Sequence, residues 1–215
     1  MILVTVMRDS AEYLHRFFDQ AEALDCHIVV AEGDSTDSTY EQLAAYGSDG
    51  RVTILKVEHG GPKFGSVDNP QRWRQLGAVC EVALTAGARI ADREPLVYIE
   101  SDLLWKPESI GLLAERALTW DAIAPMSMHL GRFYDIWGHV KDGVGFRPYP
   151  PFFPGWAGID QLYPIDSAGS CFALSPRAQQ YAHFSPVDCI RGIGRSLSEN
   201  GIVLWLDPTL TVEHP

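Results

Sequence analysis

The chain has 215 residues, of which 46% are hydrophobic and 21% are charged, and its formal net charge is −11. This composition is typical of a globular protein, and the negative charge opposes broad binding to nucleic acid or to anionic membranes. No apolar run approaches the roughly 18 residues of a membrane span, and the N-terminal MILVTVMRDS lacks the basic start of a signal peptide, so we expect no membrane insertion and a cytoplasmic location. The four cysteines lack a zinc-type spacing, which predicts free and mostly buried thiols.

Short apolar runs alternate with helical patterns through the first half of the chain. Strands are predicted over residues 2–7, 27–32, 51–58 and 95–101. Helices are predicted over residues 11–24, 38–47 and 70–87, and from 107 onward. Asp9 with Glu12, and Ser38 with Glu41, have the spacing of capping boxes, and Asn69 is a predicted helix N-cap. Because the strands are too apolar to face water, the pattern predicts a Rossmann-like α/β fold with a mostly parallel central sheet flanked by helices.

The second half of the chain is patterned differently. Residues 132–167 are dense in aromatic residues, Pro and Gly and have no clear period, which predicts an ordered, functional loop region. A strand is predicted over 168–175, and helices are predicted to begin at Ser175 and at Ser185–Pro186, the second ending near Gly201. Two further apolar runs, 202–207 and 210–214, close the chain, and no linker divides it into two domains.

Carboxylates stand at the ends of two predicted strands. Glu100 and Asp102 lie two residues apart in PLVYIESDLLWKP, and Glu32 ends the strand 27–32. Ligands of open α/β sheets bind beyond the carboxyl ends of the strands, and residues two apart can point to the same side. Glu100 and Asp102 are therefore candidates to share a divalent cation, Mn²⁺ or Mg²⁺. The alternative is that both side chains enter solvent, or that Asp102 caps the following helix.

The order of these segments resembles that of the family 2 glycosyltransferases of the GT-A fold. VVAEGDSTDST (29–39) is similar to their acidic pair followed by Gly-Ser-Thr-Asp-Gly-Thr, and ESDLLWKP (100–107) lies where that fold carries Asp-x-Asp, with Glu100 in place of the first Asp. The resemblance covers almost the whole chain. It implies one GT-A domain over 1–215, with a nucleotide-sugar-binding half over 1–105 and an aromatic-rich, acceptor-side half over 106–215.

A second resemblance, over residues 95–214, is to the fungal capsule-associated α-1,3-mannosyltransferases. Their signature has a Glu before a Gly/Ser-rich turn, a Tyr-Asp-x-Trp-like segment, a Ser-Cys segment and an acidic residue followed by Cys. The corresponding segments here are FYDIWGHVKDG (133–143), AGSCFAL (168–174) and Asp188-Cys189. Family 2 enzymes invert the anomeric configuration and the capsule-type enzymes retain it, so the two resemblances leave the stereochemical outcome open.

The GT-A resemblance implies a donor site at the strand ends. Glu32, with Asp34, would accept hydrogen bonds from the base or ribose of a nucleotide sugar, although Asp34 and Asp37 also suit the N-terminus of a helix. Lys63 and Arg72 lie in and just after the Gly-rich loop HGGPKFGSVDNPQ, where they would contact the donor diphosphate. The alternative for both cations is a solvated basic turn.

The resemblance also implies a metal site at the end of the strand 95–101. Glu100, Asp102 and the late His214 in VEHP would hold a divalent cation, Mn²⁺ or Mg²⁺, that bridges the diphosphate. Ser101, between the two carboxylates, would contact the nucleotide sugar. Without the resemblance, a histidine so near the C-terminus would be interpreted as a surface residue.

The acceptor-side residues implied by the resemblance lie in the second half. Asp188 would be the base that deprotonates the acceptor hydroxyl, although an acidic residue at the start of a helix is stabilising whatever the chemistry. Tyr134, Asp135, Trp137 and Trp156 belong to the aromatic segment and would cover the site and receive the acceptor. A satellite hydrophobic core would account for the same aromatic residues.

Together these features predict a metal-dependent glycosyltransferase that moves a hexose from a UDP- or GDP-sugar to a hydroxyl of a saccharide or another acceptor. A hydroxylated base in DNA is an alternative acceptor, which the net charge of −11 disfavours. A nucleotidyltransferase is a second alternative, but it predicts a Gly-rich basic loop after the first strand, which MRDSAEYL lacks. A non-catalytic module that binds a nucleotide sugar is the third.

Overall fold

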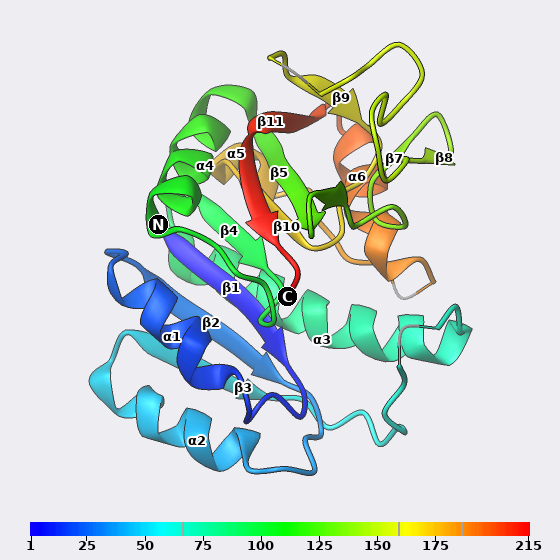
Figure 1. Cartoon of the computed structure of the whole chain (residues 1–215). Coiled ribbons are helices and arrows are strands. Elements are labelled where there is room, and N and C mark those ends of the chain that lie inside the picture. The colour runs from blue at the N-terminus through cyan, green and yellow to red at the C-terminus, as the bar shows by residue number, and fades with distance from the viewer. Residues whose placement is uncertain (66, 159, 186) are drawn as a thin grey trace.

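The computed structural model of the chain describes residues 1–65, 67–158, 160–185 and 187–215 and has one central sheet with helices on both faces (Figure 1). The strands in chain order are β1 (Ile2–Met7), β2 (His27–Glu32), β3 (Val52–Lys56), β4 (Leu96–Ile99), β5 (Ala122–His129), β6 (Arg132–Phe133), β7 (Val140–Lys141), β8 (Val144–Gly145), β9 (Tyr163–Ile165), β10 (Cys171–Leu174) and β11 (Leu204–Glu213). The helices are α1 (Leu14–Glu22), α2 (Thr39–Tyr46), α3 (Pro70–Ala91), α4 (Pro107–Trp120), α5 (Pro176–Gln179) and α6 (Cys189–Ser198), with a 3-10 turn η1 (Gly47–Asp49).

The nine-stranded sheet has the order β3-β2-β1-β4-β10-β5-β11-β9, with β6 beside β5. Strand β1 is parallel to β2 and β4, β2 is parallel to β3, and β5 is parallel to β11. Because β10 is antiparallel to both β4 and β5, the strands β1 to β5 and β11 all run in one direction. Their carboxyl ends therefore meet at one edge of the sheet, and the predicted mostly parallel α/β sheet is confirmed.

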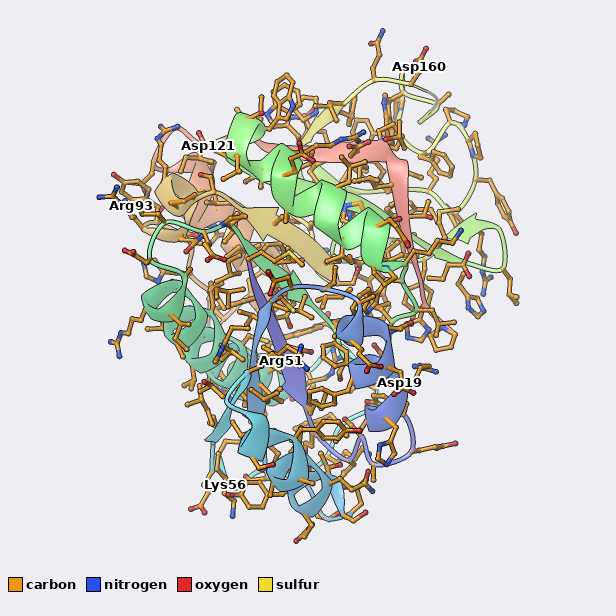
Figure 2. All side chains as sticks on the ribbon, turned by 90° about the vertical axis from the view of Figure 1, so that its left-hand side faces the viewer. Asp19, Arg51, Lys56, Arg93, Asp121 and Asp160 are labelled. Atoms are coloured by element: carbon orange, nitrogen blue, oxygen red, sulfur yellow. The ribbon has the colours of Figure 1, made fainter. Side chains whose placement is uncertain are left out.

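Two hydrophobic clusters fill the spaces between the sheet and its helices. On one face, α3, α5 and α6 pack on the sheet together with the aromatic segment, and on the other face α1, α2 and α4 do so. The helices follow the predicted spacing, since Leu14, Phe17, Phe18 and Ala21 of α1 are all buried. Labelled charged side chains such as Lys56, Arg93 and Asp160 lie at the periphery of the molecule (Figure 2).

The aromatic segment is ordered and contributes to the core. Phe133, Phe146 and Trp156 are buried, and the ring of Trp156 is stacked on that of Tyr163 with 4.7 Å between the centroids. The short strands β6 to β9 form in this region, where the sequence shows no clear helical or strand period. The aromatic segment therefore extends the hydrophobic core on the face of the sheet where α3, α5 and α6 pack.

Several predicted helix ends differ from the structure. Asp9 does not cap α1, because its Oδ1 accepts hydrogen bonds from Thr36 and the helix begins at Leu14. Ser38 is at the N-cap position of α2, but its hydroxyl accepts from the Gln42 side chain instead of capping the helix. Helix α3 continues to Ala91 rather than ending near residue 87.

The helix predicted to start at Ser185–Pro186 begins at Cys189, and Pro186 lies outside the described residues. The predicted short helix after Ser175 is confirmed, with the Ser175 hydroxyl accepting from the Ala178 amide (3.1 Å). Strand β5 was not predicted at all. Among the helices that the structure describes, none is long and apolar enough to cross a membrane.

All four cysteines are buried and free, as the sequence predicts.

Candidate functional site

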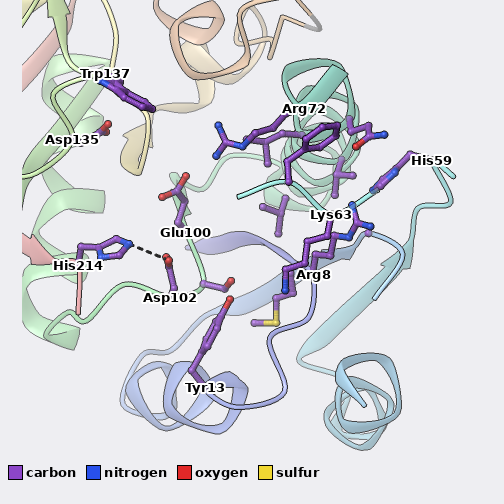
Figure 3. A pocket seen from close by; sticks show the side chains of 18 of the residues that line it. Arg8, Tyr13, His59, Lys63, Arg72, Glu100, Asp102, Asp135, Trp137 and His214 are labelled. Carbon is purple, nitrogen blue, oxygen red and sulfur yellow. Dashed lines mark ion pairs between the residues drawn. The ribbon is translucent and has the colours of Figure 1, made fainter. Parts of the chain in front are cut away.

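A cavity of about 570 Å³ opens at the edge where the carboxyl ends of β1, β2, β4 and β11 meet (Figure 3). This edge is where open α/β sheets bind their ligands, because loops after neighbouring strands surround one space there. Nine of the residues predicted from the sequence line the cavity: Lys63, Arg72, Glu100, Ser101, Asp102, Tyr134, Asp135, Trp137 and His214.

Cationic side chains gather on one side of the cavity (Figure 3). Arg8 follows β1 directly, and its guanidinium donates to the carbonyl oxygens of Gly61 (2.8 Å) and Pro62 (3.2 Å), which holds the Gly-rich loop beside the strand. Lys63 in this loop lies 3.0 Å from Asp9 (Nζ to Oδ2), and its side chain is 60% exposed. The loop therefore presents positive charge to the cavity, which favours anionic ligands.

Arg72 approaches the cavity from the first turn of α3. The predicted N-cap is confirmed, since Asn69 Oδ1 accepts from the backbone amides of Gln71 (2.8 Å) and Arg72 (3.3 Å). The Arg72 guanidinium lies over the ring of Trp73, 4.5 Å from its centroid. Its charge adds to the partial positive charge of the helix N-terminus.

Acidic side chains face these cations. Asp102 lies in the turn after β4, and its Oδ2 is 3.3 Å from Nε2 of His214, which follows β11 (Figure 3). The two residues are far apart in sequence, but Leu104 and Glu213 exchange two backbone hydrogen bonds of 2.7 and 2.8 Å beside them. This bridge brings the segment after β4 next to the last residues of the chain.

Glu100 lies between the two sides of the cavity, and its surroundings disfavour the ionised form of its carboxyl group. Burial, together with the nearby charges of Asp102 and Asp135, raises its pKa well above the ordinary value. Burial and the same carboxylates also raise the pKa of the Tyr134 hydroxyl. The acidic side thus concentrates negative charge that a cation would offset.

Asp135 is held rigidly at the cavity wall. Burial alone would raise its pKa, but hydrogen bonds from His139 Nδ1 (3.1 Å) and from the backbone amides of Gly138 (2.9 Å) and Ser170 (3.1 Å) lower it. A Cβ added at Gly138 would lie 2.5 Å from the Asp135 carboxylate oxygens, so a larger residue there would displace this carboxylate. Asp135 is therefore an ionised carboxylate in a fixed orientation.

The donor atoms at this edge suit Mn²⁺ or Mg²⁺ only in part. No three His, Cys, Asp or Glu side chains in the described part of the chain converge closely enough to hold a metal ion. Asp102 and His214 are close enough to supply one oxygen and one nitrogen, and Glu100 is a further carboxyl group that lines the same cavity. Mg²⁺-type ions in nucleotide sites commonly take only one or two carboxylates from the protein and complete their shell with phosphate and water. The residues therefore fit an ion that arrives with a diphosphate.

Glu32 and Asp34 lie beside the cavity, and neither is part of its lining. Glu32 is buried, with Oε1 accepting from the Ser35 amide (2.6 Å), while its Oε2 has no hydrogen-bond partner among the described residues. Asp34 Oδ2 accepts from the backbone amides of His59 (2.9 Å) and Gly60 (2.7 Å). Both carboxylates thus shape the loops that follow β2 and β3.

Trp156 and Asp188 also lie outside the cavity lining. Trp156 belongs to the aromatic core and is 8% exposed. Asp188 precedes the first residue of α6, where its side chain is 38% exposed and its Oδ2 lies 3.9 Å from Arg195 Nη2. The first turn of α6 contacts the cavity wall, because Arg191 Nε donates to the carbonyl oxygen of Trp137 (3.2 Å).

Eleven of the residues that line the cavity were not predicted from the sequence, and Arg8, Tyr13 and His59 are among those with polar or charged side chains. The sequence could have indicated Arg8 in the same way as Glu32 and Glu100, because it also stands at the carboxyl end of a buried strand and therefore lies at this edge of the sheet. Tyr13 and His59 lie in loops whose paths no sequence pattern fixes.

Comparisons with known proteins agree with this architecture. The family model described as Glycosyl transferase family 2 matches residues 2–171. No curated protein matches the chain. Among solved structures, S. aureus TarS 1–349 aligns with a TM-score of 0.64 at 12% identity, covering 99% of this chain and 59% of TarS.

Two further structures are complexes with small molecules. S. aureus TarS 1–349 in complex with UDP-GlcNAc aligns with a TM-score of 0.61 at 13% identity, over 99% of this chain and 57% of TarS. GalNAc-T7 with UDP, GalNAc and Mn²⁺ aligns with a TM-score of 0.64 at 17% identity, over 99% of this chain and 43% of GalNAc-T7. At these identities the likeness shows the GT-A fold, and this chain spans about half the length of those proteins. By the family match over most of its length, the chain belongs to glycosyl transferase family 2.

Proposed function

We propose that the chain is a metal-dependent glycosyltransferase that moves a hexose from a nucleoside diphosphate sugar to a hydroxyl acceptor. The observation that carries this proposal is the cavity at the carboxyl edge of the sheet, with Arg8, Lys63 and Arg72 on one side and Asp102 and His214 on the other. A diphosphate suits the space between them, because cations and a bound metal would then contact it from opposite sides. Family membership supports the same chemistry.

The donor would lie across the ends of β1, β2 and β4. Arg72 and Lys63 would bind the diphosphate oxygens, and Asp102 with His214 and Glu100 would hold the cation, which when bound neutralises the leaving diphosphate. Glu32 Oε2, a buried acceptor without a partner among the described residues, is the atom we propose for an N–H or O–H of the nucleoside. Asp34 accepts a hydrogen bond from the backbone amide of His59, and it would thereby hold this loop beside the bound nucleoside.

The acceptor would enter beside the aromatic segment. Trp137 is 50% exposed at the cavity, which suits packing against the apolar face of a sugar ring, and Tyr134 and Asp135 lie next to it. We propose Asp188 as the base for the acceptor hydroxyl and a saccharide as the acceptor class. The comparisons do not show the expected likeness to the capsule-associated mannosyltransferases, and GDP-mannose is included among the donors to test it.

Calorimetric titration tests the donor site. UDP-glucose, UDP-GlcNAc and GDP-mannose would each be titrated into the protein with Mn²⁺ and, separately, with EDTA. We expect one donor to bind with Mn²⁺ and to lose at least tenfold in affinity with EDTA or in the Asp102→Ala variant. Asp19→Ala removes an exposed carboxylate on the outer side of α1 (Figure 2) and should bind like the wild type.

The proposal fails if no nucleotide sugar binds in the presence of Mn²⁺. If a donor binds but is neither hydrolysed nor transferred to any sugar acceptor, the chain is a binding module instead. The anomeric configuration of a product, read by NMR, would distinguish inversion from retention.

A further inference from the structure

We propose that Gln20, on α1, is a positioning residue for the metal ligands Asp102 and His214, an inference that rests on the proposed function. Gln20 contacts the segment 102–105 and is absent from the lining of the cavity. Its side-chain amide makes two hydrogen bonds to that segment. Nε2 donates to the Leu103 carbonyl (3.3 Å), and Oε1 accepts from the Trp105 amide (3.1 Å).

A second side chain of α1 contacts the same segment one turn earlier. Arg16 Nη2 donates to the carbonyl oxygen of Asp102 (2.7 Å). Residues 16 and 20 are four apart and so lie on the same face of the helix. Three hydrogen bonds from α1 therefore hold the backbone of 102–105 from one side.

The opposite side of the segment is held by the last strand. Leu104 and Glu213 exchange backbone hydrogen bonds of 2.7 and 2.8 Å, and the next residue, His214, donates its backbone amide to Met128 O (2.8 Å). The segment is thus fixed between α1 and β11. Any shift of this segment would change the 3.3 Å separation between Asp102 Oδ2 and His214 Nε2.

The chemistry of glutamine suits this position. Leu103 and Trp105 are buried, so the Leu103 carbonyl and the Trp105 amide each need a hydrogen-bond partner. If the Gln20 side chain is lost, these two groups must find other partners, and the segment would move to do so. Glutamine supplies a donor and an acceptor at once, whereas leucine supplies neither and glutamate supplies only acceptors. Glutamate would also place negative charge against the Leu103 carbonyl.

The test compares metal-dependent with metal-independent binding. In the first titration, UDP is added to the wild type, Gln20→Leu and Gln20→Glu in the presence of EDTA. In the second, without EDTA, Mn²⁺ is added to the UDP complex of each protein, and its binding is measured by electron paramagnetic resonance. We expect Mn²⁺ affinity to fall about tenfold in both variants, as for residues that orient metal ligands, while UDP affinity in EDTA stays within about twofold. Phe18→Leu weakens the stacking of α1 on Tyr46 and leaves the side chains of Arg16 and Gln20 unchanged, so it should lower the melting temperature without altering either affinity.

Two results would overturn the inference. One is Mn²⁺ affinity equal to that of the wild type in Gln20→Leu or, if that variant does not fold, in Gln20→Glu. The other is an equal loss of UDP affinity in EDTA, which would indicate general loosening of the fold. Failure of the wild type itself to bind Mn²⁺ with UDP would overturn the proposed function, and so the two failures are distinguishable.

Discussion

Asp188 directly precedes α6, the helix whose first turn contacts the cavity through Arg191 and Trp137. If Asp188 deprotonates the acceptor, Asp188→Asn should lower kcat by about 10²- to 10⁴-fold, because general base catalysis contributes this much. Donor affinity in Mn²⁺ should stay unchanged, since Asp188 lies outside the cavity lining. Initial rates and calorimetry on the same preparation measure the two quantities. A kcat within threefold of the wild type would leave Asp188 with a role at the helix start alone.

Asp9 gives a prediction about pH. Burial would raise its pKa, but hydrogen bonds from Thr36 N (2.6 Å) and Oγ1 (3.2 Å), and the nearby Lys63, lower the pKa from 3.8 to about 2. The ionised form therefore stabilises the fold above about pH 4, and this contribution is lost as the pH falls through 2.

Replacing Asp9 by Asn should lower the free energy of unfolding by about 1 kcal/mol at pH 7, a value reduced from the full conversion of the pKa shift because Lys63 is exposed. The difference from the wild type should shrink toward zero near pH 2. Urea unfolding at pH 7, 4 and 2 measures it. Asp25→Asn, at an exposed position, is the control, and a difference for Asp9→Asn that does not change with pH would contradict this account.

Single residues also show how far the sequence could predict the site. Glu100 and Asp102 line the cavity at the predicted edge, because a strand end fixes where the next residues go, whereas His214 was expected there only from the GT-A resemblance. The partners of each side chain could not be predicted, since they come from distant segments. Asp9 was expected to cap its own helix but instead binds Thr36, because a hydrogen bond between loops replaced the local one.

At the scale of elements, the strongly patterned segments were predicted well and the weakly patterned one was missed. Strands β1 and β2 match their predicted bounds because they are rich in β-branched residues. Strand β5, AIAPMSMH, contains Pro and Ala and only one β-branched residue, so its pairing with β10 and β11 decides its conformation. Helix starts were the least predictable, because a cap depends on tertiary neighbours.

Helix α6 packs so closely on the segment before β10 that one position excludes any side chain. A Cβ added at Gly194 would lie 1.7 Å from the Asp166 carbonyl oxygen and 2.9 Å from the Ser167 Cα. Gly194→Ala should therefore lower the free energy of unfolding by about 3 kcal/mol, as overpacking against backbone does. Gly111 of α4, with no described atom within 4 Å of an added Cβ, is the matched control.

Gly111→Ala should be neutral or stabilise by up to about 1 kcal/mol, because alanine is the better helix former. Urea unfolding compares the two variants under one condition. Equal stability of Gly194→Ala and the wild type would show that α6 can move away from Asp166 at little cost.

For the whole molecule, the sequence order of strands and helices predicted the sheet, and the sheet predicted one edge for the site. The antiparallel insertion of β10 between β4 and β5 was not predictable, since nothing local specifies a partner strand. This insertion matters for folding because β10 belongs to the second half of the chain and pairs with β4 of the first. Phe172 of β10 lies opposite Tyr98 of β4, and their rings stack with 5.1 Å between centroids.

Because one sheet joins the two halves, we propose that residues 1–215 unfold as a single domain. Urea unfolding should give one transition with the same midpoint by far-UV circular dichroism and by tryptophan fluorescence. The fluorescence reports mainly on the second half, which contains Trp120, Trp137, Trp156 and Trp205. With Mn²⁺ and UDP at about 100 times the dissociation constant, both midpoints should rise together, by the equivalent of about 2.7 kcal/mol. Two separate midpoints, of which the ligand raises only one, would mean that the halves 1–105 and 106–215 fold independently and that the donor site belongs to one of them.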